Sequence, residues 1–516
     1  MSRTHRFLGG LSLGYLYLGL VTIVGLWLTP FLLSRIGTHD YGLWLVTTQI
    51  LGYLQLLDLG VVALAPREVA YATGRALQGT EGASVAETVA RFRRVVAWQV
   101  PATAIVAAIC WWAVASRWPE LRAPLAVIVV AFVAAFPLRL FNATLQGLQD
   151  LAFLGRVQLW SWLCGTTVTI VLVLRGAGLG ALAAGWVVTQ AVSAVSCGIR
   201  LRRHFASAWN APRASVPWRD ARQLMGRSVW ISLSQLGQVL LAGSDLLIIG
   251  AVFGPAAAVP YACTGKLVTV LANHPQLLMQ TAAPALAEMR TGASRSRVTE
   301  VALALMRAML VVSGGVAAFV LAVNAAFVSW WVGPAQYGGF LLTVLFVVTM
   351  LVRHLGTTLT YALFAFGHER RLSLTAIVDG AVTALATAVL AFTTDLGIAS
   401  APLGSLAGVV LVNIPATSLG LSRELSISPV ALFASLRGWA IRFVAVAVAA
   451  VIASRTLDPH GLTGLAWMSA LVCAAYVVVM LPLALKPPLG PYLRAAVAPL
   501  VALVTRPAAT ASSGRP

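Results

Sequence analysis

The chain has 516 residues, of which 59% are hydrophobic and 10% are charged, and 36 Lys and Arg against 16 Asp and Glu give a formal net charge of +20. A soluble domain is close to half apolar and about a quarter charged, so this composition excludes a soluble globular protein and indicates an integral membrane protein. The basic residues lie mostly in short loops between apolar runs, where membrane topology explains them better than nucleic-acid binding.

Apolar runs long enough to cross a bilayer, each of about 20 residues, follow one another along the chain. They predict an all-α polytopic membrane protein with about 14 transmembrane helices. A count of twelve or thirteen transmembrane helices is also possible, because the fifth and thirteenth apolar runs are short. The predicted spans are 11–33, 41–65, 95–115, 124–146, 159–174, 179–199, 228–252, 261–284, 305–330, 339–364, 373–394, 398–420, 438–454 and 464–485.

The distribution of Lys and Arg predicts the orientation of these spans. Most of the 36 basic residues lie at the N-terminus, in every second loop and in the C-terminal tail. Because loops rich in Lys and Arg stay in the cytoplasm, both termini are expected there, in a multi-pass membrane protein. A cleaved signal peptide is not expected, because the first apolar run is long. The opposite loops hold only Arg35, Arg117, Arg122, Arg175 and Arg455.

The longest polar connection, 200–227, lies close to the middle of the chain and carries seven arginines. Two similar halves joined by an inner linker are a common plan for transporters. The organisation predicted is an N-terminal lobe of six spans, a basic cytoplasmic linker, a C-terminal lobe of six spans, two further spans and a cytoplasmic tail. Their ranges are 1–199, 200–227, 228–420, 421–485 and 486–516.

The sequence lacks the motifs of the common enzyme classes. Lys266 sits in a Thr-Gly-Lys stretch, but Pro260 and Leu267 replace the Gly and the Ser or Thr that a phosphate-binding loop requires. The histidines offer no zinc spacing, and the five cysteines fall in or beside spans without a disulfide or metal pattern. We therefore expect a transporter and no enzyme, with no catalytic residue, no metal site and no cofactor.

Ionisable side chains inside the spans are candidate site residues, because membrane burial is costly unless they face a cavity or a partner. Asp58 is expected to pair with Arg67 or with Arg139, or to be capped by the backbone. Arg139 either pairs with Asp58 or extends to the inner headgroups. Lys266 lies near the outer end of its span, so it either reaches the outer surface or faces a cavity.

Five more ionisable side chains lie within the later predicted spans. Arg353 is close to the middle of its span, and a cavity-facing position is expected. His354 and His274 are either cavity residues or satisfied core histidines. Asp245 and Asp379 have no charged neighbour within a helical turn, which favours a cavity over lipid.

Several stretches together resemble one transporter family. The similarity to the bacterial oligosaccharide (O-antigen, Wzx-type) flippases of the multidrug/oligosaccharidyl-lipid/polysaccharide exporter superfamily runs to about residue 425. The order and spacing of the stretches carry it. They are PFLLSRIGTHDYGLWLVTTQILGYLQLLDLGV at 30–61, SDLLIIGAVFGPAAAVPYACTGKLV at 244–268, WWVGPAQYGGF at 330–340 and FGHERRLSL at 366–374.

This resemblance implies two six-helix lobes related by a pseudo-twofold axis, with two extra C-terminal helices. It implies a flippase that moves an oligosaccharide on undecaprenyl diphosphate to the outer leaflet, by alternating access coupled to an H⁺ or Na⁺ gradient. The implied substrate-binding cavity residues are Lys266, Arg353, Arg139, His274 and His354, and the implied ion-coupling residues are Asp245, Asp379 and Asp58.

The expected partners are the lipid-linked oligosaccharide, membrane lipids and a polysaccharide polymerase with its chain-length proteins, and nucleic acid is not among them. One alternative is a multidrug antiporter, which the spans beyond twelve and the basic intramembrane residues disfavour. The other is a membrane polymerase or ligase, which usually carries a large outer loop that is not apparent here.

Overall fold

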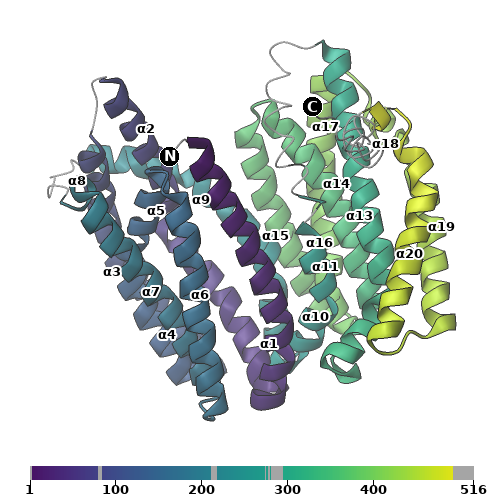
Figure 1. Cartoon of the computed structure of the whole chain (residues 1–516), viewed down its shortest axis with the longest axis horizontal. Helices are drawn as coiled ribbons and strands as arrows, with labels where there is room; N and C mark the ends of the chain where they lie inside the picture. Colours follow the sequence, from purple (N-terminus) through teal and green to yellow (C-terminus); the bar gives the residue numbers. More distant parts are fainter. Residues whose placement is uncertain are drawn as a thin grey trace, which may run out of the picture. The chain divides into compact units, whose positions relative to one another are not determined.

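The computed structural model describes residues 3–79, 84–210, 218–273, 275, 276, 279, 294–487 and 489–491. Every regular element within these ranges is a helix (Figure 1). The predicted all-α fold class is therefore confirmed.

Twelve helices of the described part are long and apolar enough to cross a membrane. The helix α1 (Arg3–Leu54) includes the predicted span 11–33 and the first part of the predicted span 41–65. Between them it turns at Gly37, whose φ of 82° only glycine adopts without strain. The predicted span 261–284 is described only at its start, by α10 (Ala258–Thr264) and α11 (Lys266–Leu271). A count between twelve and fourteen agrees with the sequence.

One compact unit comprises residues 1–262 and 376–401. Within it α6 packs along α7, α1 contacts α6 and α9, α2 contacts α3 and α5, and α4 contacts α7. The interior holds large apolar side chains such as Phe92 and Phe136. The helices are α2 (Val61–Gln78), α3 (Val85–Arg117), α4 (Arg122–Ala135), α5 (Arg139–Gly147), α6 (Leu151–Leu174), α7 (Leu179–His204), α8 (Ala206–Trp209) and α9 (Trp218–Val252).

The second unit comprises residues 263–375 and 402–516, as far as these are described. Its central helix is α13, which packs against α14, α19 and α20, and the last two lie side by side (Figure 1). A five-residue π-helical segment, Val409–Asn413, precedes α17. The helices are α13 (Arg295–Val332), α14 (Phe340–Ala365), α17 (Ile414–Leu425), α18 (Pro429–Ala434), α19 (Arg437–Leu457) and α20 (Gly461–Ala484).

Three helices of the described part carry the chain from one unit to the other. They are α10, α15 (Glu369–Thr393) and α16 (Ser400–Gly408). The units are defined by contacts and do not coincide with the predicted lobes 1–199 and 228–420, whose boundaries stay a prediction.

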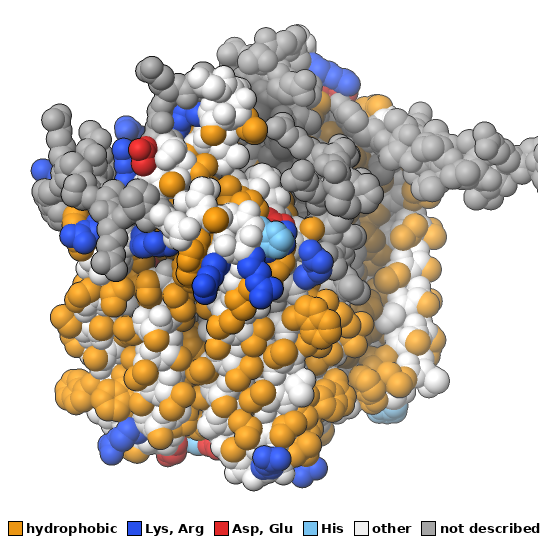
Figure 2. Space-filling model, turned by 60° about the vertical axis from the view of Figure 1, so that its left-hand side comes forward, with side chains coloured by type: hydrophobic (Ala, Val, Ile, Leu, Met, Phe, Trp, Pro, Cys, Tyr) orange, Lys and Arg blue, Asp and Glu red, His pale blue; other side chains and the backbone are white. Residues whose placement is uncertain are grey.

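The surface has the character of a membrane protein. Figure 2 shows one face, on which a broad area of hydrophobic side chains lies between two groups of Lys and Arg. Large apolar side chains such as Ile105, Trp112 and Val478 are 62%, 68% and 71% exposed. Such a surface is unfavourable in water and suits hydrocarbon.

Candidate functional site

The helical path breaks between α1 and α2, within the second predicted span, 41–65. The 3₁₀ turn Gln55–Asp58 is followed by Leu59 and Gly60, whose φ values of 49° and 71° are left-handed. A side chain at Gly60 has no room, because a Cβ there would lie 2.7 Å from the carbonyl oxygen of Ser228. Glycine thus allows the chain to change direction against α9.

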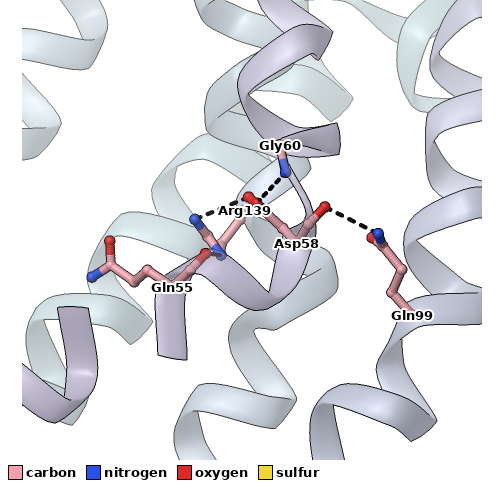
Figure 3. A network of polar contacts seen from close by, with 5 residues as sticks. All are labelled: Gln55, Asp58, Gly60, Gln99 and Arg139. Carbon is pink, nitrogen blue, oxygen red and sulfur yellow. Dashed lines mark hydrogen bonds and ion pairs between the residues drawn. The ribbon is translucent and has the colours of Figure 1, made fainter. Parts of the chain in front are cut away.

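Two side chains donate hydrogen bonds to backbone carbonyl groups at the break (Figure 3). The Nε2 of Gln99 donates to the Asp58 carbonyl oxygen at 3.0 Å. The Nη1 of Arg139 donates to the Gln55 carbonyl oxygen at 3.3 Å. An irregular backbone at membrane depth is tolerated where protein groups satisfy it in this way.

The carboxylate of Asp58 is 3% exposed and is held from two sides (Figure 3). Its Oδ2 lies 3.3 Å from Nη2 of Arg139, and its Oδ1 accepts the backbone N–H of Gly60 at 2.9 Å. Of the alternatives predicted for Asp58, pairing with Arg139 and capping by the backbone are both confirmed. The ion pair offsets part of the free-energy cost of burying the charged carboxylate.

Arg139 is placed by a local change of helix type. It begins α5 directly after the 3₁₀ turn Phe136–Leu138. Its guanidinium carbon lies 5.9 Å from the ring centroid of Phe136, a cation–π distance. The side chain is still 30% exposed, so the guanidinium is anchored at one side and accessible at the other.

The accessible side of Arg139 faces a cavity of about 590 Å³ inside the first unit. This volume lies within the range of about 300–1,000 Å³ that is usual for ligand sites. The wall comes from α2, α5, α7 and α9, together with the end of α4 and the 3₁₀ turns beside it. Its polar lining residues are Asp58, Arg67, Arg139, Asn142, Gln146, Gln190, Ser193 and Gln235.

The lining of this cavity suits an anion that also carries hydroxyl groups. Arg139 and Arg67 supply guanidinium forks, which bind phosphate oxygens with two parallel hydrogen bonds. The amides of Asn142, Gln146 and Gln190 both donate and accept hydrogen bonds, as sugar hydroxyls require.

Arg353, the deepest basic residue of the sequence prediction, lies on α14 in the second unit. Its Nε donates to the Ser405 hydroxyl at 2.7 Å, and its Nη2 donates to the Ser405 carbonyl oxygen at 2.9 Å. Ser405 belongs to α16, one turn before the π-helical segment. These bonds support a role in holding α16, and a contact with substrate stays a prediction.

His354 corresponds to one of the two alternatives predicted for it. Its side chain is buried at 2% exposure, and Nδ1 lies 2.6 Å from the Ser313 hydroxyl oxygen. This is the environment of a satisfied core histidine. The other candidate histidine, His274, lies outside the described residues.

Lys266 is the first residue of α11 and is half-buried. The preceding Gly265 packs against the ring of Phe346, so that a Cβ there would lie 2.9 Å from Cζ of that ring. Among the described residues Lys266 forms no ion pair. Its contact with the outer surface or with a cavity stays a prediction.

The two predicted ion-coupling carboxylates of the later spans both bond to hydroxyl groups. Asp245 on α9 accepts a hydrogen bond from Tyr261 at 2.6 Å. Asp379 on α15 has no exposed surface, and the Thr383 hydroxyl lies 3.4 Å from its Oδ1. In the described ranges no three His, Cys, Asp or Glu side chains come together as metal ligands would.

The sequence analysis missed the neutral amides of the cavity. Gln99 holds the helix break, and Gln146, Gln190 and Gln235 line the wall. A signal for them exists, because an uncharged amide inside an apolar span also costs free energy unless it finds a partner.

Comparison with known proteins identifies the fold and gives a partial match to one protein family. Residues 85–335 match the family model described as polysaccharide biosynthesis protein. The comparison with curated proteins gives no match. An inward-facing multidrug resistance MATE family transporter of the MOP superfamily is similar with a TM-score of 0.60 and 13% identity, over 77% of this chain and 93% of that chain. The lipid II flippase MurJ, in its inward closed conformation, is similar with a TM-score of 0.60 and 9% identity, over 91% of this chain and 99% of that chain.

Identities this low establish the fold alone, and the two proteins that share it are a transporter and a flippase. The family model adds the connection to polysaccharide biosynthesis. The chain is thus a multi-pass membrane protein with the fold that the MATE family transporter and MurJ share, and its residues 85–335 match the family model described as polysaccharide biosynthesis protein.

Proposed function

We propose that the protein is a flippase that moves lipid-linked oligosaccharide, carried on undecaprenyl diphosphate, from the inner to the outer leaflet of the bacterial cytoplasmic membrane. Both termini lie in the cytoplasm, and translocation proceeds by alternating access. The observation that carries the proposal is the arginine-lined polar cavity beside the helix break, in a chain whose residues 85–335 match the polysaccharide biosynthesis protein model.

The chemistry of the cavity supports a diphosphate headgroup as the ligand. A diphosphate is a dense anion, and Arg139 is a cation held rigidly at the cavity wall. Because Asp58 already binds Arg139, an incoming phosphate competes with that carboxylate for the guanidinium. The site therefore favours a strong divalent anion over a weak one, and the neighbouring amides accept the first sugar.

Coupling to an H⁺ or Na⁺ gradient is part of the proposal. The carboxylates proposed for it are Asp58, Asp245 and Asp379, each of which bonds to a group that a cation or a proton displaces. A change in the charge of Asp58 alters its hold on Arg139, which links the ion to the substrate site.

A multidrug antiporter is the second candidate, and the similarity to the MATE family transporter favours it. The two proposals differ in the charge of the cargo. Cationic drugs require acidic cavities, whereas the cavity described above carries two arginines and one buried aspartate.

Depletion of the protein in its own host tests the two functions side by side. We expect lipid-linked oligosaccharide to accumulate in the inner leaflet, as measured by accessibility to a membrane-impermeant glycan-modifying enzyme, with drug susceptibility unchanged. Export should return with the wild-type protein and fail with Arg139→Gln at equal expression. Arg156→Gln, an exposed arginine of α6 outside the cavity lining, is the matched control. Normal export combined with drug hypersensitivity would rule out the flippase.

A further inference from the structure

A second cavity lies in the other unit, where the C-terminal end of α13 meets the turn between α19 and α20. Its volume is about 400 Å³, within the range of ligand sites. Three segments line it. They are Ala325, Ala326, Ser329 and Trp330 from α13, Ser454 from α19, and Asp458, Pro459, His460 and Gly461 from the turn.

The turn that closes this cavity has a fixed shape. Asp458 and Gly461 have φ values of 39° and 65°, both left-handed. Pro459 is buried and packs so closely on Gly464 that a Cβ there would lie 3.0 Å from the Pro459 carbonyl carbon. Because proline also restricts its own φ, little ordering entropy is lost when a ligand enters.

One wall of the cavity is aromatic. The side chain of Trp330 is 49% exposed. Phe327 supports it from behind, with ring centroids 6.4 Å apart, and stacks at 5.4 Å on Trp331. The indole is therefore held on one side and presents surface on the other.

The remaining wall is polar. The Oδ2 of Asp458 lies 3.0 Å from Nε2 of His460, and both side chains are mostly exposed. Ser329 and Ser454 add hydroxyl groups. These groups both donate and accept hydrogen bonds at short range.

A pyranose ring has an apolar C–H face and a rim of hydroxyl groups, so it matches an exposed indole with polar groups around it. The Asp458 carboxylate repels a negatively charged ligand, which disfavours an acidic sugar. We propose that this cavity binds one neutral or N-acetylated sugar residue. The proposal rests on the proposed function for the source of that sugar, the translocated glycan, because the α19–α20 turn lies on the predicted outer side.

The binding of free sugars to this cavity can be measured without a translocation assay. Saturation-transfer difference NMR of the purified full chain in detergent would use D-glucose, D-galactose and N-acetyl-D-glucosamine as probes, with D-glucuronate as the acidic comparison. We expect transfer to the neutral sugars and little to glucuronate. Trp330→Ala should weaken the apparent Kd about tenfold, the order of magnitude of one lost aromatic contact.

Three further variants make the result decisive. Trp112→Ala removes an indole that is 68% exposed on α3 and should leave binding unchanged. Ser454→Phe fills the cavity while Trp330 stays, and should abolish binding. Asp458→Asn should retain the neutral sugars and raise the glucuronate signal. No transfer from any neutral sugar to the wild-type chain, or equal transfer with Trp330→Ala or Ser454→Phe, would overturn the proposal. A failed translocation assay would leave these results intact, so the two proposals fail separately.

Discussion

Asp58 and Arg139 depend on each other, because the carboxylate is 3% exposed and its Oδ2 lies 3.3 Å from the guanidinium. Arg139→Gln leaves a buried carboxylate without its cation, which typically costs roughly 3–5 kcal/mol. We expect a clear fall in the thermal midpoint of the purified protein, measured by fluorescence-detected unfolding. The double variant Asp58→Asn/Arg139→Gln should recover much of the loss. Losses that simply add would contradict the pairing.

Lys266 is half-buried at the start of α11. Removing its charge tests whether the side chain faces a cavity or reaches the outer surface. If the ammonium binds the anionic substrate, Lys266→Ala should lower polysaccharide export several-fold and Lys266→Arg should retain most of it. Export is measured by complementation of a deletion strain at equal expression. Normal export by the Ala variant would place the ammonium in the outer headgroups instead.

The candidate site could be predicted in part, because charges inside apolar spans are visible in sequence. Asp58 and Arg139 stand out in this way, and the sequence predicts their pairing as one alternative. The partner of Arg353 was not predictable, because Ser405 is a common polar residue 52 positions away and only the tertiary fold brings the two together. The amides of the cavity are harder to recognise in the sequence, because they carry no charge.

At the scale of helices, α6 and α7 pack through matching glycine and threonine positions. A Cβ at Gly165 would lie 2.6 Å from the Gly185 carbonyl oxygen, and a Cβ at Gly185 would lie 2.7 Å from that of Gly165. Thr189 and Thr169 lie directly opposite the two glycines. Small residues four apart allow such a close approach between membrane helices.

Gly185→Val should therefore separate α6 from α7 and lower stability by about 1–3 kcal/mol, the usual cost of overpacking. Gly180→Val on the same helix meets no atom within 4 Å and serves as the matched control. The thermal midpoints of the two variants are compared in one detergent. Equal midpoints would show that the helices adjust freely.

Hydropathy predicted where the helices run, because each span must satisfy its backbone and bury its surface within the bilayer. It did not predict their local irregularities. The left-handed Leu59 beside Gly60 and the π-helical segment Val409–Asn413 depend on neighbouring helices rather than on local composition. Irregular turns of this kind occur often at functional sites.

At the scale of the whole molecule, α19 and α20 are an integral part of the second unit. The Tyr476 hydroxyl donates to the Val311 carbonyl oxygen of α13 at 2.5 Å, over a surface that Gly314 and Gly315 leave flat. Trp439 and Phe443 stack with ring centroids 5.2 Å apart beside it.

Gly314→Leu should therefore displace α20 and reduce the yield of folded protein, as measured by size-exclusion chromatography. The conservative Tyr476→Phe should retain the fold with a smaller loss.

The basic loops predict an orientation of the chain, and this orientation determines on which side each cavity opens. After replacement of the five cysteines, Glu120→Cys probes the 3₁₀ turn between α3 and α4, and Gln78→Cys probes the C-terminal end of α2. Both positions are exposed. The positive-inside rule predicts that a membrane-impermeant maleimide labels Glu120→Cys in intact spheroplasts, and Gln78→Cys only after permeabilisation.

The reverse labelling pattern would place both termini outside the cell. The α19–α20 turn would then face the cytoplasm, and the sugar cavity could not meet a glycan that has already been translocated. The same measurement therefore tests the topology and the direction of transport. The charge asymmetry is large and recurs from loop to loop, so we expect labelling at Glu120→Cys first, with the arginine-lined cavity of the first unit loaded from the cytoplasmic side.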